Sequence, residues 1–232
     1  MRTFLAGTKY FQLSNIFVFF GLLIVISGLY ALTRNPVKKE MPSQNKKMVF
    51  KRKYWLFYTL NFLSGARRQI FVAFAVFMLV EKFEFKVETI AILFIINNII
   101  TYFTAPLIGK AINKFGERIV LSVEYCSLII IFICYAFVED KMIVAVLYVL
   151  DHIFFGAAMA VNTYFQKIGE SKDIAPSMAV GFTINHISAV IIPVVGGALW
   201  MIDSRIPFLV GSAIALVSLL FVQFIKTKPQ HP

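Results

Sequence analysis

Long apolar runs separated by polar turns make up most of the chain from residue 12 onward. A helix needs about 20 mainly apolar residues to cross the hydrocarbon core of a bilayer, where it satisfies its own backbone hydrogen bonds. Seven runs meet this requirement, at 12–33, 55–80, 87–108, 119–138, 142–166, 175–201 and 206–225. None alternates apolar and polar residues with a period of two, the pattern of a membrane strand. The pattern therefore predicts an all-α, polytopic membrane protein with seven transmembrane helices.

The composition agrees with a lipid environment and changes how the charge is interpreted. Hydrophobic residues make up 59% of the chain, charged residues 15%, and the formal net charge is +11. A soluble protein with this charge would suggest a nucleic-acid partner. Here the basic residues lie between the apolar runs, as expected for topology signals that contact an anionic lipid surface. We therefore expect the lipid bilayer as a partner and no nucleic acid.

One polar segment divides the chain. Residues 34–53 combine eight Lys and Arg with two prolines, which is typical of a basic linker. We expect an N-terminal segment with the first helix at 1–33, this linker at 34–53, a six-helix bundle at 54–226 and a short tail at 227–232. The apolar stretch after Lys9 is too long for a cleavable signal peptide, so it should remain in the mature protein.

The basic residues also predict the orientation. If the linker is cytoplasmic, the turns at 109–118 and 167–174 and the C-terminal tail lie on the same side, which then holds fifteen Lys and Arg against six on the other. Basic residues concentrate in cytoplasmic loops. The distribution predicts a multi-pass inner-membrane protein with its N-terminus outside and its C-terminus in the cytoplasm.

A glycine-containing loop follows the third predicted helix. It runs Gly109-Lys-Ala-Ile-Asn113-Lys-Phe-Gly116-Glu117-Arg118. Glycines suit a tight turn where backbones approach closely, and the basic residues cannot follow the chain into lipid. The spacing resembles G-x-x-x-D-x-x-G-R-[RK], the signature loop of the major facilitator superfamily. Gly109, Gly116 and Arg118 match, whereas Asn113 replaces the usual Asp and Glu117 a basic residue.

The resemblance extends to the linker, which looks like the long cytoplasmic loop joining the two six-helix halves of such transporters. It implies that 12–33 corresponds to the sixth helix and that the following six helices form the second half bundle. It also implies that about five N-terminal helices are absent. The missing half, or a second chain, would then be a partner, because facilitators enclose a path between two halves.

Ionisable residues within the predicted helices mark the candidate site, because charges in hydrocarbon must face protein or a water-filled cavity. Arg67 and Arg68 lie near the middle of 55–80. Asn61, Gly65 and Arg68 share one helical face. The planar guanidinium suits an anionic group on a substrate. The alternative is that one arginine pairs with an intramembrane acid and holds helices together.

Asp151 and His152, at the middle of 142–166, are the expected partners of these arginines. The helical repeat places His152 and Met159 on one face and Asp151 with Asn162 on the neighbouring face. A carboxylate beside an imidazole could exchange a coupling proton during transport. Equally, Asp151 could only neutralise an arginine.

Two further polar positions are weaker candidates. Asn185 and His186 lie in the middle of 175–201, where the imidazole either contacts substrate or is hydrogen-bonded in the packing. Glu124 lies near the cytoplasmic end of 119–138, so we expect a structural charge that pairs with Arg118 or a neighbouring basic loop.

These features favour part of a secondary transporter that moves a small solute by alternating access. The arginines suggest an anionic substrate, but the same residues can also serve as counter-ions within a helix bundle. Two alternatives are a non-transporting receptor or scaffold and an intramembrane metalloenzyme. The second lacks support, since the sequence has no HExxH, GxSxG or paired-aspartate motif and its two cysteines lie within one apolar run. We expect no enzyme activity, cofactor or metal.

Overall fold

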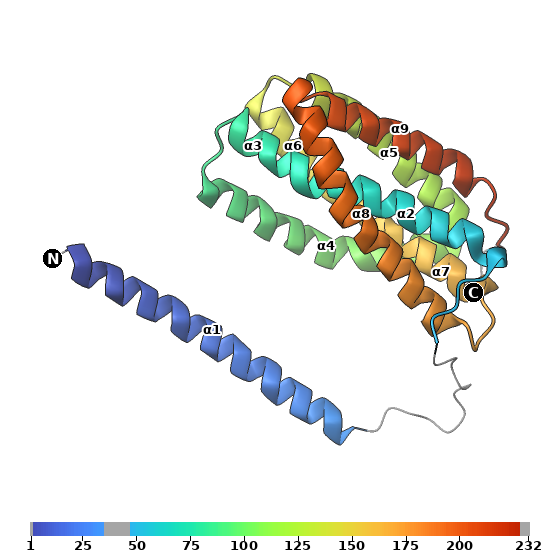
Figure 1. Ribbon diagram of the computed structural model, residues 1–232, viewed down its shortest axis with the longest axis horizontal. Coiled ribbons are helices and arrows are strands. Elements are labelled where there is room, and N and C mark those ends of the chain that lie inside the picture. The colour runs from blue at the N-terminus through green and yellow to red at the C-terminus, as the bar shows by residue number, and fades with distance from the viewer. Residues whose placement is uncertain (1, 35–46, 228–232) are drawn as a thin grey trace. The chain divides into compact units, whose positions relative to one another are not determined.

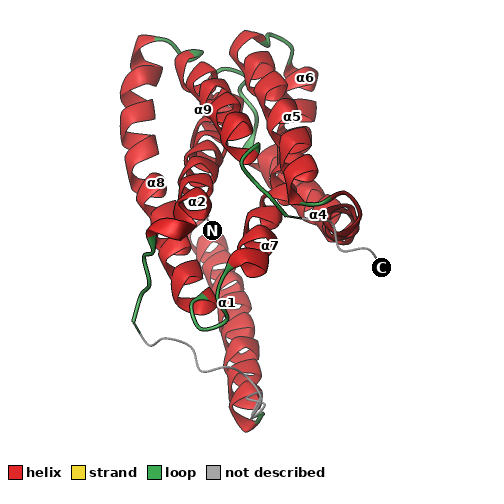
Figure 2. Ribbon diagram, turned by 90° about the vertical axis from the view of Figure 1, so that its right-hand side faces the viewer, coloured by secondary structure: helices red, strands yellow, loops and turns green. Residues whose placement is uncertain are grey.

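A computed structural model describes residues 2–34 and 47–227. All the regular structure in these two ranges is helical, as Figure 2 shows, so the predicted all-α class is confirmed. The chain divides into two compact units, Met1–Pro42 and Ser43–Pro232. The first contains α1, Arg2–Thr33. The predictions for residues 35–46 of the linker and 228–232 of the tail lie outside the described residues.

The second unit is a bundle in which two long helices are each interrupted. The first comprises the 3-10 turn η1 (Arg52–Tyr54), α2 (Trp55–Gln69), the π-helical segment η2 (Ile70–Ala75) and α3 (Val76–Glu81). The second comprises α6 (Lys141–Phe155), the 3-10 segment η3 (Gly156–Ala158) and α7 (Met159–Ile168). Four uninterrupted helices complete the bundle: α4 (Val87–Phe115), α5 (Glu117–Phe137), α8 (Ile174–Ile202) and α9 (Ile206–Val222).

Most of these helices are long enough for a bilayer. Among the described residues, five are long and apolar enough to cross a membrane: Arg52–Glu81, Val87–Phe115, Glu117–Phe137, Lys141–Ile168 and Ile174–Ile202. Two shorter apolar segments, Phe17–Thr33 and Ile206–Val222, occupy the remaining predicted positions. Each apolar run of the sequence is thus helical, and the polytopic membrane class is confirmed.

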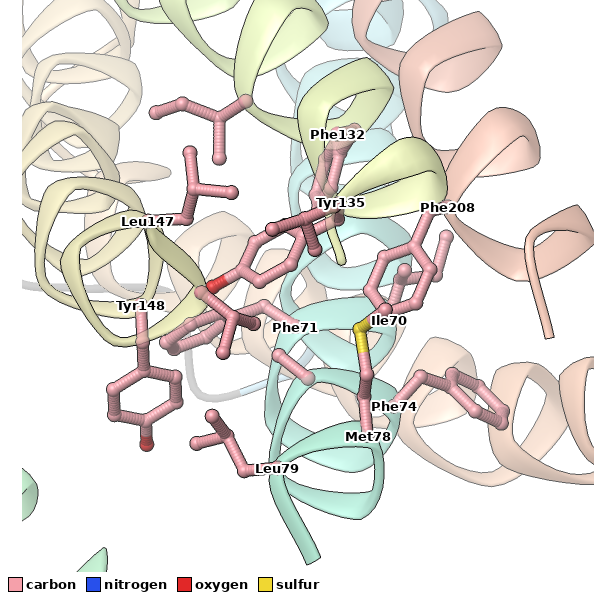
Figure 3. Packing of buried hydrophobic residues seen from close by; sticks show 14 of the residues in the cluster. Ile70, Phe71, Phe74, Met78, Leu79, Phe132, Tyr135, Leu147, Tyr148 and Phe208 are labelled. Atoms are coloured by element: carbon pink, nitrogen blue, oxygen red, sulfur yellow. The ribbon is translucent and has the colours of Figure 1, made fainter. Parts of the chain in front are cut away.

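The core lies where α2, η2, α5, α6 and α9 meet. In Figure 1, α5 runs beside α9 and α2 beside α8, which are the two most extensive helix pairs. Phe71 stacks on Tyr148 and Tyr135 on Phe208, with Phe132 and Ile70 packed nearby (Figure 3). Dispersion contacts and close packing, rather than exclusion of water, hold such apolar faces together in a membrane. This packing fixes how α2 is rotated about its axis and therefore where its polar residues point.

Candidate functional site: two arginines and a polar cavity

Arg67 points into the bundle core. Its side chain is fully buried, its Nη1 lies 3.4 Å from Oε1 of Glu124, and its guanidinium lies 4.2 Å from the centre of the Tyr125 ring. The guanidinium therefore gains both an ion pair and a cation–π contact with α5. The expected pairing of Glu124 with Arg118 is wrong, because Arg118 instead donates two hydrogen bonds to Oε1 of Gln223.

Asp151 is the second acid of this core. Its side chain is fully buried on α6, and neither carboxylate oxygen has a hydrogen-bond partner. It interacts electrostatically with Arg67 and with the other acid, Glu124, but the ion pair of Arg67 is with Glu124. Arg67 is thus the arginine that partners Asp151, through an electrostatic interaction without a salt bridge. The three ionisable side chains comprise one cation and two acids, so Arg67 is the one cation that can balance both carboxyl groups in this cluster.

Arg68 points away from that core into a polar cavity of about 540 Å³. The lining residues come from α2, η2, α7 and α8: Asn61, Arg68, Gln69, Val72, Asn162, Met178, Phe182, Asn185 and His186. A smaller adjoining hollow of about 190 Å³ shares Asn61, Arg68, Asn162 and Asn185. A cationic side chain among several amides can hold an anion and donate hydrogen bonds to it.

Close packing of α2 on α8 positions this cavity. A Cβ added at Gly65 would lie 3.0 Å from the backbone of Asn185, a tight contact that would push the two helices slightly apart. Ser188 strengthens the contact by donating to the carbonyl of Phe62 at 3.2 Å. Directly after Asn185, His186 packs against Phe182 with ring centres 4.3 Å apart. The candidates Asn185 and His186 thus lie in the same cavity as Arg68.

His152 lies elsewhere. It is half-buried and packs near the Phe71 ring, at 6.2 Å between centres, and it is not among the residues that line the cavity. The sequence candidates therefore separate into two groups. Arg68, Asn185 and His186 share the cavity, whereas Arg67, Asp151 and Glu124 form the buried charge cluster.

Both interrupted helices deviate from α geometry next to these residues. The π segment η2 begins at Ile70, two residues after Arg68, and the 3-10 segment η3 begins at Gly156, four residues after His152. A π segment within an α-helix is frequently found at functional sites, and a 3-10 segment in mid-helix often marks a hinge. The two helices that supply Arg68 and Asn162 thus each contain a segment of non-α geometry beside the cavity.

The loop that resembles the facilitator signature is shorter than the sequence suggested. Helix α4 continues to Phe115, and only Gly116, with φ of 83°, breaks it. This backbone conformation favours glycine. Nothing lies within 4 Å of a Cβ added at Gly109, so no close approach requires glycine there. The buried Glu117 contacts Lys167 Nζ and Thr227 Oγ1, each at 2.6 Å, and connects the loop to α7 and the segment after α9.

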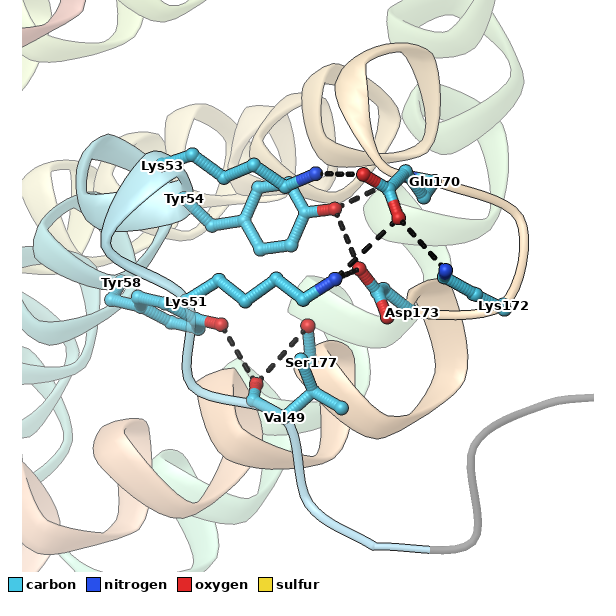
Figure 4. A network of polar contacts seen from close by, with 9 residues as sticks. All are labelled: Val49, Lys51, Lys53, Tyr54, Tyr58, Glu170, Lys172, Asp173 and Ser177. Carbon is cyan, nitrogen blue, oxygen red and sulfur yellow. Dashed lines mark hydrogen bonds and ion pairs between the residues drawn. The ribbon is translucent and has the colours of Figure 1, made fainter.

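A network of ion pairs holds the start of the long α2 helix to the loop before α8 (Figure 4). Lys51 pairs with Asp173, Lys53 pairs with Glu170, and Tyr54 donates to Asp173 at 3.0 Å. Asp173 is fully buried. The hydrogen bond to Asp173 raises the pKa of Lys51, and the hydrogen bond from Lys53 lowers the pKa of Glu170.

Replacing Asp173 by asparagine should therefore lower the melting temperature of the detergent-solubilised chain by a few degrees. The stabilisation from the Glu170 carboxylate is present above the ordinary glutamate pKa of 4.5 and is lost as pH falls. The stabilisation from the Lys51 ammonium is present below the ordinary lysine pKa of 10.5 and is lost as pH rises further. The difference between variant and parent should thus be constant from about pH 6 to pH 9. Glu139→Gln, an exposed acid in another loop, is the control. A Tm for Asp173→Asn equal to that of the parent would contradict the role of the network.

The sequence alone did not reveal several of these contacts. Gln69 and Phe182 line the cavity. In the sequence, these two residues could have been found only from their positions: Gln69 follows Arg68, and Phe182 lies one helical turn before His186. The pairing of Lys51 with Asp173 joins residues far apart in the chain, and no local pattern indicates it. The described residues contain no group of three or more His, Cys, Asp or Glu side chains that could hold a metal ion.

The fold and the cavity define a polytopic helical membrane protein with a polar site between its helices, and the comparisons identify the family. The Major Facilitator Superfamily profile matches residues 4–173. The chain belongs to this superfamily, whose members are membrane transporters rather than enzymes.

One relative can be named. The chain is 27% identical over 199 residues to Multidrug resistance protein 1 of Bacillus subtilis (strain 168), and the alignment covers 82% of the chain and 50% of the relative. The chain thus spans about half the length of the curated relative it matches. No solved structure matches it significantly.

Proposed function

We propose that the chain is part of a secondary active transporter that moves a small solute across the inner membrane. The observation that carries this proposal is the cavity of about 540 Å³ in which Arg68, four side-chain amides and His186 converge. Polar groups within a bilayer are retained where they serve a substrate or ion pathway. The family to which the chain belongs, and the multidrug resistance relative, support the same activity.

The cavity favours an anionic substrate. Among the described residues Arg68 forms no ion pair, and its guanidinium carbon lies 5.8 Å from the centre of the Phe155 ring. The bonding capacity of the guanidinium is therefore available. Its planar fork is suited to a carboxylate or phosphate, and the amides of Asn61, Asn162 and Asn185 can donate additional hydrogen bonds.

Alternating access is the proposed mechanism, with this bundle moving against a second set of helices around a site at the membrane midplane. The π segment η2 and the 3-10 segment η3 are the points at which the two cavity helices would bend. The proposed orientation places the N-terminus outside and the loops at 116 and 169–173 in the cytoplasm, as the distribution of basic residues indicates. The second set of helices would come from another part of a longer protein or from a second chain.

Transport of a carboxylate-bearing dye tests the function. Energised cells that produce the chain as it occurs naturally should export fluorescein faster than matched cells lacking it. The excess should disappear when a protonophore collapses the proton gradient, because a secondary transporter draws on that gradient. Equal export from both cell types would favour the alternative of a non-transporting receptor or scaffold.

Asp151 is the proposed site for the coupling proton. Its buried carboxylate has no hydrogen-bond partner, and protonation would remove a charge that Arg67, already paired with Glu124, does not fully compensate. Replacing Asp151 by asparagine imitates the protonated form. We expect the variant to keep or exceed the parent's melting temperature, while its dye export no longer responds to an imposed pH gradient. Parent-like response to the gradient would exclude Asp151 as the coupling group.

A further inference from the structure

A second cavity lies at the end of the bundle formed by α3 and the C-terminal end of α8. Its volume is about 520 Å³, and its lining residues are Phe74, Phe77, Glu81, Gly197, Trp200 and Met201. None of them lines the Arg68 cavity. The Arg68 cavity presents a cation and amides, whereas this one presents aromatic rings and a carboxylate, so the two favour ligands of opposite charge.

Two phenylalanine rings of this cavity pack around Trp200. The Phe74 ring stacks on the indole with centres 5.9 Å apart, and the Phe77 ring meets it at 61° with centres 5.1 Å apart. A Cβ added at Gly196 would lie 2.5 Å from the Phe74 ring, so glycine leaves the space in which this ring is held. Phe77 remains 46% exposed. The faces of such rings carry negative electrostatic potential and attract cations.

Glu81 adds a formal negative charge beside these rings. The indole Nε1 of Trp200 donates to Oε2 of Glu81 at 2.9 Å, which fixes the carboxylate at the edge of the indole. None of the ion pairs found among the described residues includes Glu81. The neighbouring Lys82 instead donates to the carbonyl of Val138 at 2.9 Å. The carboxylate is therefore oriented by the protein and lacks a protein cation.

We propose that this cavity binds a methylated ammonium group. Such a cation spreads its charge over several methyl groups and has no strong hydrogen-bond requirement, so aromatic faces and one carboxylate can replace its water. A metal ion would need more oxygen ligands than the single carboxylate among the lining residues provides. The group could belong to a free small molecule or to a choline lipid headgroup. The inference does not depend on the proposed function, because it concerns another cavity.

Trp200 provides a direct readout. The full chain carrying Trp55→Phe retains Trp200 as its single tryptophan and would be purified in a maltoside detergent, which contains no ammonium group. Choline should change the Trp200 emission in a saturable way. Its uncharged isostere 3,3-dimethylbutanol, in which carbon replaces nitrogen, should not. Equal responses to both compounds, or no response to choline in detergent or in any lipid, would overturn the proposal.

Two matched variants test the carboxylate. Glu81→Gln keeps an oxygen that can accept from Trp200 and should weaken choline binding about 5- to 30-fold, the range expected when a charge–charge contact in a partly buried site is lost. Glu139→Gln removes an equally exposed acid from the loop before α6 and should leave the affinity unchanged. Both should keep the parent's melting temperature. Parent-like affinity in a folded Glu81→Gln protein would overturn the proposal.

Lipid composition distinguishes the two sources of the group. In nanodiscs of phosphatidylglycerol, added choline should again change the emission. If a lipid headgroup is the natural occupant, nanodiscs of phosphatidylcholine should show the changed emission without added choline, and this difference should disappear in Glu81→Gln. If a free ammonium compound is the occupant, the choline titration should be the same in both lipids. Arg68→Ala should bind choline normally, so failure of the anion site would not affect this test.

Discussion

Replacing Arg67 by methionine should lower the melting temperature of the purified chain by about 10 °C, because loss of one partner of a buried ion pair costs about 3–5 kcal/mol. The variant leaves Glu124 and Asp151 as two buried carboxylates without a cation. It also removes the guanidinium that packs on Tyr125 at 4.2 Å. Thermal unfolding followed by size-exclusion chromatography measures the loss.

Arg68→Met is the matched control, because it makes the same chemical change at the adjacent but exposed position. It should unfold at nearly the parent's temperature. The double variant Arg67→Met/Glu124→Gln should recover part of the loss, since it also removes an unpaired acid. Glu124→Gln alone should cost less than Arg67→Met, because Asp151 remains as an electrostatic partner of Arg67. If Arg67→Met and Arg68→Met were equally stable, the assignment of Arg67 to the core would be wrong.

Replacing Arg68 by alanine should reduce the apparent affinity of the chain for fluorescein by about 10- to 100-fold, since a hydrogen bond to a charged group contributes about 1.5–3 kcal/mol. The cavity would keep its amides but lose its only Lys or Arg side chain. Dye export should fall accordingly, whereas the melting temperature should not change. Fluorescence anisotropy of the dye with the detergent-solubilised chain measures the affinity.

Two variants make the interpretation specific. Arg68→Lys keeps the charge but not the planar fork, so its affinity should lie between those of the parent and Arg68→Ala. Arg205→Ala removes an arginine outside the cavity, near Phe137, and should bind the dye like the parent. If the parent and Arg68→Ala bind the dye equally, Arg68 is not part of the binding site.

The course of the chain through the membrane could be predicted from the sequence, because it depends on local composition. Each apolar run is helical, and the class of fold follows from their number and length. The predicted positions of the helix ends were less accurate. Helix α4 extends to Phe115 because the long side chains of Lys110 and Lys114 can reach an interface from within its last turns. The break then depends on Gly116 alone.

The partners of the buried charges could not be predicted, because they depend on the rotation of separate helices about their axes. The sequence shows that Arg67 and Asp151 lie at similar depths, but in the folded bundle it is Glu124 of α5 that comes within ion-pair distance of Arg67. Rotation of one helix by half a turn would exchange the neighbours without changing the hydropathy pattern.

Only some of the cavity-lining residues could be predicted from the sequence, because the lining also depends on helix rotation. An ideal helix places Asp151 and Asn162 on one face, and His152 and Met159 on the neighbouring face. The 3-10 segment at Gly156–Ala158 has fewer residues per turn and rotates the second part of the helix relative to the first. Asn162 and Met159 therefore line the polar hollows, whereas Asp151 and His152 do not.

Thiol labelling in native membranes tests most directly whether the Arg68 cavity is open to water. After Cys126 and Cys134 are replaced by alanine, a charged, water-soluble thiosulfonate would be applied to His186→Cys, in the cavity, and to Ile130→Cys, an exposed apolar position on α5. The cavity thiol should react, and a carboxylate-bearing dye should slow the reaction, whereas the α5 thiol should remain unlabelled in lipid. An unreactive His186→Cys, or equal labelling at both positions, would contradict a water-filled substrate cavity at Arg68.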